Sequence, residues 1–216
     1  NTYVGLKNYE MAIQDFIKAE KLDSDNELKS SFRLYNQMAI TYDHVSDKEK
    51  VLEYLNKQIN FTPSYSLAYR NRGIFYWWDL SNYKMALADL NKAIEVSPND
   101  SSNYIKRGDF YYYLEEYEKA LIDYTSAIQI KPSSGNFYKR AVLRYSNEDY
   151  ELAVADYLRA LELDGDQKTS NNEYLLNGLA LSYKQLGNLD NAIIFLKKEI
   201  ELSPLNSLPY RNLGDI

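Results

Sequence analysis

The sequence contains no cysteine, one histidine, eight glycines and five prolines, and these shortages each remove a class of site. Without cysteine the chain forms no disulfide and no thiolate metal site. His44, the single histidine, has no second His or Cys to share a metal ion, so we expect a surface side chain near a helix end. The glycines are isolated, which excludes a Gly-rich phosphate-binding loop. We therefore predict no metal ligand, no cofactor and no cofactor-binding residue.

Long hydrophobic runs and an excess of positive charge are also missing. No stretch of about 18 apolar residues is present, and no secretory hydrophobic region is found. Lys and Arg total 25 against 31 Asp and Glu, which gives a net charge of -6. No basic field attracts nucleic acid or an anionic membrane. The Ser and Thr hydroxyls lack a nearby base, so no catalytic residue is expected either.

Small residues and helix breakers recur at equal intervals. Gly108, Ala120 and Pro132 follow one another at steps of twelve residues. The same steps occur in Ala39–Val51–Pro63, Ala141–Ala153–Gly165 and Ala180–Ala192–Pro204, and Gly73–Ala86–Pro98 has one extra residue in its first step. Small residues let two helix backbones approach closely, and proline cannot continue a helix. The pattern predicts helix–turn–helix repeats that stack on copies of themselves.

The pattern divides the whole chain into repeats. In residues 101–133, side chains follow the i, i+3, i+4, i+7 spacing of one helix face on both sides of a turn at 114–117. Complete repeats are expected at 32–65, 66–100, 101–133, 134–165 and 173–206, with partial ones at 1–24 and 207–216. Segments 25–31 and 166–172 are longer connections, expected to extend the next helix; protruding recognition loops are the alternative. Because the chain begins at Asn1, we expect a fragment or a processed piece.

The segment YIKRGDFYYYLEEYEKALIDYTSAIQIKP, residues 104–132, resembles the tetratricopeptide repeat (TPR), a helix–turn–helix unit of about 34 residues. The resemblance covers essentially the entire chain. It implies an all-α fold, a single α-solenoid over residues 1–216 that coils as a right-handed superhelix with the first helices along a concave groove. An irregular helical bundle is the alternative, but bundles do not need a fixed repeat period.

Arginine and aspartate occur together in three repeats. Arg72, Arg107 and Arg140 precede the small residue of the first helix, and Asp89, Asp123 and Asp156 lie in the second helix of the same repeats. The first and fifth complete repeats carry apolar or aromatic residues at both places. We predict the ion pairs Arg72–Asp89, Arg107–Asp123 and Arg140–Asp156. A ladder of arginines that binds an acidic ligand is the alternative.

The groove face is expected three residues before, one after and four after the small residue of each first helix. The resulting strip is aromatic in its middle, which suits a peptide or a partner helix. The predicted groove residues are Asn36, Arg70, Ile74, Trp77, Asp109, Tyr112, Tyr138 and Tyr145, and the same rule selects Ile40, Asp43, Ile105, Val142, Asn177, Leu181 and Lys184. Trp78 is expected to fill the core more than Trp77.

These features predict a non-catalytic scaffold that binds a protein or peptide partner, not an enzyme. One alternative is an accessory domain of a larger enzyme or signalling protein; another is self-association through open ends, although a monomer is expected. The TPR class that grips chaperone tails is not favoured, because Ile40 and Ser102 stand where it needs Asn and Lys. Gln58 and Glu199 replace the alanine of other repeats, so polar or looser packing is expected there.

Overall fold

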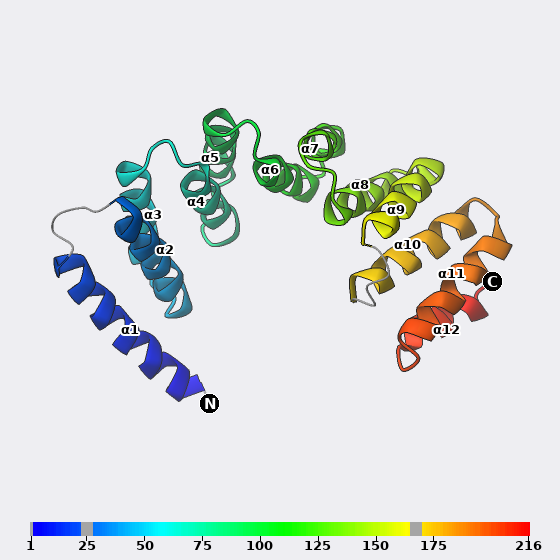
Figure 1. The fold of residues 1–216 in the computed structure, drawn as a ribbon, viewed down its shortest axis with the longest axis horizontal. Coiled ribbons are helices and arrows are strands. Elements are labelled where there is room, and N and C mark those ends of the chain that lie inside the picture. The colour runs from blue at the N-terminus through cyan, green and yellow to red at the C-terminus, as the bar shows by residue number, and fades with distance from the viewer. Residues whose placement is uncertain (1, 23–27, 165–169) are drawn as a thin grey trace. The chain divides into compact units, whose positions relative to one another are not determined.

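The structure is a computed structural model that describes residues 2–22, 28–164 and 170–216. Within these ranges every regular element is a helix (Figure 1). The helices are α1 (Thr2–Leu22), α2 (Leu28–His44), α3 (Lys48–Phe61), α4 (Ser66–Trp78), α5 (Tyr83–Val96), α6 (Ser101–Tyr113), α7 (Tyr117–Ile130), α8 (Ser134–Ser146), α9 (Tyr150–Asp164), α10 (Ser170–Gln185), α11 (Leu189–Leu202) and α12 (Ser207–Gly214).

The chain forms two compact units, Asn1–Lys106 and Arg107–Ile216, and the boundary lies inside α6. In the N-terminal unit α2 packs on α3 and α4 packs on α5. Contacts between α3 and α4 join these two pairs. In the C-terminal unit α8 packs on α9 and α10 packs on α11, and α9 contacts α10. Helix pairs stacked on the next pair make each unit an α-solenoid, as predicted.

The turn between the two helices of a pair has the same backbone in five pairs. One residue adopts a positive φ, and these residues are Ser46 (61°), Ser81 (49°), Glu115 (60°), Glu148 (65°) and Gly187 (72°). A left-handed residue is a common way to end a helix because its amide can reach the last carbonyls. The Asp47, Asn82 and Asn188 side chains then accept from the third backbone amide of the next helix, which satisfies one of its unpaired donors.

The periodic small residues lie where helices meet. Ala86, Ala120, Ala141, Ala153 and Ala192 are all fully buried. A Cβ atom on Gly108 would stand 2.8 Å from the Tyr124 ring, closer than carbon atoms approach. These positions therefore set the distance between the two helices of a pair, and their role is packing.

The three predicted ion pairs are confirmed. Arg72 Nε and Nη2 donate to the Asp89 carboxylate at 2.7 and 2.8 Å, and Arg107 and Arg140 bind Asp123 and Asp156 with the same two-pronged geometry. The aspartate side chains are only 2–6% exposed. Arg144 also donates to Asp156 Oδ2, at 2.7 Å. The guanidinium groups of Arg72, Arg107 and Arg140 thus join α4 to α5, α6 to α7 and α8 to α9.

The two residues that replace alanine are buried polar groups, as expected. Gln58 and Glu199 are 0% and 1% exposed. Gln58 Nε2 donates to the Phe32 carbonyl at 3.5 Å. Glu199 lies near Glu173, and burial followed by the charge of Glu173 raises the pKa of Glu199 to about 7. Among the described residues, Glu199 Oε2 has no hydrogen-bond partner.

The two longer connections partly extend the helices that follow them. Helices α2 and α10 have 17 and 16 residues, whereas α4, α6 and α8 have 13. Residues 28–31 and 170–172 therefore belong to the next helix, as predicted. Residues 25–27 and 166–169 of these connections, and the helix-ending Gly165, lie outside the described residues.

Candidate binding grooves

A groove of about 430 Å³ lies between the first helices of two successive pairs, α2 and α4. We call it the α2–α4 groove. Its floor is apolar, and its sides carry amide and carboxylate groups. The lining residues are Asn36, Ala39, Ile40 and Asp43 from α2, Val51 and Leu55 from α3, and Leu67, Asn71, Ile74, Phe75 and Asp79 from α4 and its C-terminal cap.

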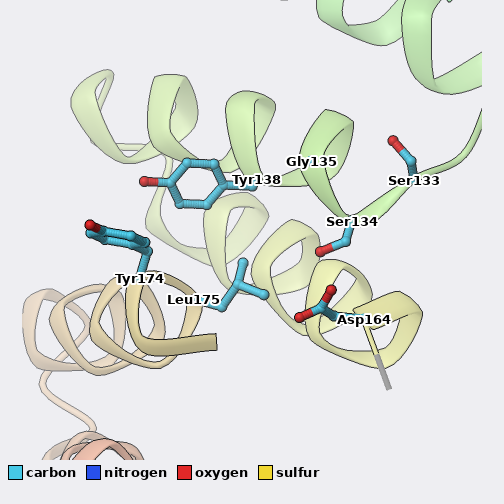
Figure 2. Close-up of a pocket in the computed structure, with 7 residues that line it drawn as sticks. All are labelled: Ser133, Ser134, Gly135, Tyr138, Asp164, Tyr174 and Leu175. Atoms are coloured by element: carbon cyan, nitrogen blue, oxygen red, sulfur yellow. The ribbon is translucent and has the colours of Figure 1, made fainter. Parts of the chain in front are cut away.

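A second groove, of about 310 Å³, lies between α8 and α10, and we call it the α8–α10 groove. Figure 2 shows Tyr138 of α8 above Tyr174 and Leu175 of α10, with Asp164 beyond Leu175 and Ser133 and Ser134 at the start of α8. Burial raises the pKa of Tyr138 further above its ordinary value. The two tyrosines offer aromatic surface to a segment placed between the helices.

On the first of its two helices, the α2–α4 groove is lined by all three predicted positions, whereas the α8–α10 groove is lined by one of three. Asn36, Ile40 and Asp43 stand three before, one after and four after Ala39, and all three line the α2–α4 groove. Tyr138 stands three before Ala141 and lines the α8–α10 groove. Ile74, predicted on α4, also lines the α2–α4 groove.

The second helix of each groove contributes a different strip. Leu67 and Asn71 of α4 stand six and two residues before Gly73, and Tyr174 stands six before Ala180. The sequence prediction missed these residues because it assigned one strip to every first helix. A groove between two parallel neighbours is lined by facing sides of the two helices, and on the second helix that side is rotated by about one residue.

Two of the predicted groove residues bind neighbouring helices. Arg70 Nη1 donates to Asp100 Oδ2 at 2.9 Å and to Asn103 Oδ1 at 2.7 Å. Although burial alone raises it, hydrogen bonds from Ser102 and Arg70 hold the pKa of Asp100 below its ordinary value. Asp109 accepts from the Tyr124 hydroxyl at 2.9 Å and from Lys139 Nζ at 2.8 Å. Arg70 and Asp109 are therefore tied to adjacent helices.

The prediction for the two tryptophans is wrong in its assignment of core and surface. Trp77, placed in the groove strip, is 5% exposed, whereas Trp78, placed in the core, is 60% exposed. The extra residue of this repeat lies after α4, because the left-handed Ser81 stands eight residues after Gly73 and the others stand seven after their small residue. The insertion lengthens the turn and opens no space inside, and the Trp78 ring stacks on Trp77 at 4.5 Å.

Tyr112 and Tyr145, which line neither groove, are aromatic and partly accessible. Of the other positions selected by the same rule, Ile105 is buried, and Val142, Asn177, Leu181 and Lys184 are half-buried. Tyr112 is 37% exposed and its ring lies 5.6 Å from that of Tyr117. Tyr145 is half-buried and meets the Tyr150 ring edge-on at 5.4 Å. Each of these pairs joins the end of a first helix to the start of the second. Both tyrosines keep a face that a ligand can contact.

Groups suited to other functions are sparse in the described part of the chain. Over residues 2–22, 28–164 and 170–216, no three His, Cys, Asp or Glu side chains gather as a metal site would require. His44 is exposed at the end of α2, as predicted, and stacks on Tyr9 at 4.5 Å. None of the helices described is long and apolar enough to cross a membrane.

Comparison with protein families gives matches over most of the chain. Two tetratricopeptide repeat models match, one at residues 138–207 and the other at 1–26, 68–100 and 101–134. No curated protein sequence matches the chain.

Solved structures with the same fold are plentiful but distant in sequence. BtubC (BKLC) from P. vanneervenii gives a TM-score of 0.74 at 11% identity, over 94% of this chain and 91% of that one. A tetratricopeptide repeat protein from Parabacteroides merdae gives 0.69 at 21% identity, over 86% and 72%. YrrB, a TPR protein with an unusual peptide-binding site, gives 0.66 at 18% identity, over 91% and 96%. At these identities the likeness concerns the fold.

Proposed function

Because the chain belongs to the tetratricopeptide repeat family, we propose that it is a non-catalytic interaction module that binds a segment of a partner protein along its first helices. The observation that carries the proposal is the pair of grooves between successive first helices, α2–α4 and α8–α10. The α2–α4 groove has an apolar floor with a few polar groups at the sides, as ligand sites generally do, and the α8–α10 groove combines two tyrosines and a leucine with polar groups. The peptide-binding site of YrrB supports the same use of this fold.

The proposed contacts follow from exposure. Ile74, Tyr112, Tyr138 and Tyr145 contact the partner directly, and Asn36 lines the groove while its Oδ1 accepts from Asn71 of α4. Arg70 and Asp109 act as supports, because their polar atoms hold neighbouring helices. Trp77 shapes the end of α4 from inside, since it is almost fully buried.

The proposal is tested by comparing which binding partners are captured by the wild-type chain, by two groove variants and by a control variant. Ile40→Ser and Tyr138→Ser each change one groove and leave the helix pairs intact, and Ile122→Ser is the control, because Ile122 of α7 is 65% exposed and lines neither groove. We expect the groove variants to lose partners that the wild-type chain and the control retain. If both groove variants keep every partner while circular dichroism shows unchanged helix content, the groove is not the binding site.

A further inference from the structure

The α2–α4 groove is graded from neutral to acidic along its length. Asn71 Nδ2 donates to Asn36 Oδ1 at 3.1 Å, which closes one end with an amide pair. Ile40 and Ile74 follow in the middle, and Asp43 and Asp79 lie at the other end. Helix α2, and α4 together with its C-terminal cap, thus each contribute an amide, an aliphatic side chain and a carboxylate in the same order.

The carboxylates at the acidic end are only partly neutralised by nearby positive charge. Burial, and then the charge of Asp43, raise the pKa of Asp79, and Lys48 offsets these effects only in part. Lys48 Nζ donates to the Asp79 carbonyl oxygen. Both helices also end here, α2 at His44 and α4 at Trp78, so the negative ends of their dipoles add to the two carboxylates. A cation placed at this end gains from the two carboxylates and from the end of α2, while Lys48 already binds the carbonyl at the end of α4.

From these observations, and resting on the proposed function, we propose that the α2–α4 groove selects an extended partner segment that combines a Lys or Arg with an aliphatic residue. The basic side chain binds between Asp43 and Asp79, and the aliphatic one lies on Ile40 and Ile74. Asp43 follows Ile40 after a step of three helical residues, a rise of about 4.5 Å. Successive side chains of an extended chain point to opposite faces, and alternate ones lie about 6.6 Å apart. The two side chains that enter the groove are therefore two positions apart in the partner.

Helices α10 and α12 provide an internal contrast. Asn212 Nδ2 donates to Asn177 Oδ1 at 2.9 Å, which repeats the amide pair between α10 and α12. Lys184 stands four residues after Ala180, where Asp43 stands four after Ala39. The acidic end therefore belongs to the α2–α4 groove in particular and is not a consequence of the repeat.

The test begins with a displayed library of randomised short peptides selected on the whole chain. Enriched peptides are then synthesised, and their dissociation constants are measured by fluorescence anisotropy. We expect enrichment of Lys or Arg two positions from Ile, Leu or Val. The double variant Asp43→Asn/Asp79→Asn should weaken these peptides by about tenfold or more, and Asp43→Lys should weaken them further.

Two controls keep the outcomes distinct. Glu49→Gln removes an exposed carboxylate of α3 that does not line the groove, and it should change the affinity by less than about twofold. The Asp43→Asn/Asp79→Asn variant should stay folded, because it only removes the repulsion between the two carboxylates. Thermal unfolding followed by circular dichroism checks this. Peptides that are acidic or uncharged, or that bind the double Asn variant unchanged, overturn the proposed selectivity. If such peptides still lose affinity in Ile40→Ser or Tyr138→Ser, groove binding stands; if no peptide is enriched, both proposals fail.

Discussion

Replacement of Glu199 by glutamine should stabilise the chain at neutral pH and leave it nearly unchanged in mild acid. Glu199 of α11 is 1% exposed, and its position in other repeats is held by Ala93, Ala127 and Ala160. Glu173 of α10 faces it, and Ser203 Oγ donates to the Glu173 carboxylate. The folded state therefore favours the protonated, neutral form of Glu199.

The magnitude follows from the pKa of Glu199. The value rises from an ordinary 4.5 to about 7 in the folded chain, and such a difference corresponds to about 3 kcal/mol between the two protonation states. A raised carboxyl pKa means that the folded state binds a proton that the unfolded state has released. The stability is therefore full below about pH 4.5 and falls as pH rises to about 7.

A glutamine side chain at this position would need no such proton, and Gln58 shows that the fold accepts a buried amide at the matching position of another repeat. The expected gain for Glu199→Gln is about 2–3 kcal/mol at pH 8 and close to zero at pH 4.5. Each repeat contacts only its neighbours, so the effect is local. Hydrogen exchange of the α11 amides is the appropriate assay, measured across this pH range for both chains.

Glu201→Gln is the matched control, because Glu201 lies on the same helix and is exposed. It should give the same protection as wild type at every pH. A carboxyl pKa near 4.5 for Glu199 by NMR, or a stabilisation that does not change with pH, would refute the reasoning.

Three further substitutions test the packing. Arg107→Leu alone should destabilise by about 3–5 kcal/mol, because it leaves a buried carboxylate, and adding Asp123→Leu should recover much of this loss; additive effects in denaturant unfolding would exclude the coupling. Gly187→Ala should cost about 1 kcal/mol in the same assay, since the positive φ of 72° disfavours any side chain although the space is open. Trp77→Ala should cost about 3–5 kcal/mol, and Trp78→Ala much less; equal losses would contradict their observed burial.

Most of the fold is encoded in local patterns. Helix faces and the small residues at 39, 73, 108, 141 and 180 act between neighbouring helices, so spacing alone locates them. The prolines at 63, 98, 132 and 204 follow the same spacing because each stands just after a helix. The Arg–Asp pairs were predictable for a different reason. Two residues that are present or absent together in several repeats point to a contact, and Arg107 and Asp123 illustrate it.

The grooves were predictable only in part. Asn36, Ile40 and Asp43 lie on the face given by the spacing, but Asn71 and Tyr174 belong to the facing side of the next helix. Their position depends on how two helices are rotated against each other, which the sequence period does not specify. The tryptophan assignment failed because the inserted residue was absorbed by the turn before Ser81 and left the core unchanged.

Site-specific photocrosslinking tests most directly the claim that partners bind between the first helices. A photoreactive amino acid at Ile40, 46% exposed in the α2–α4 groove, is compared with the same group at Met85, 38% exposed on α5 and outside it. With a library-selected basic peptide, the account predicts a crosslink from position 40 and none from position 85. A crosslink from position 85 alone would place the partner on the second helices and contradict the account.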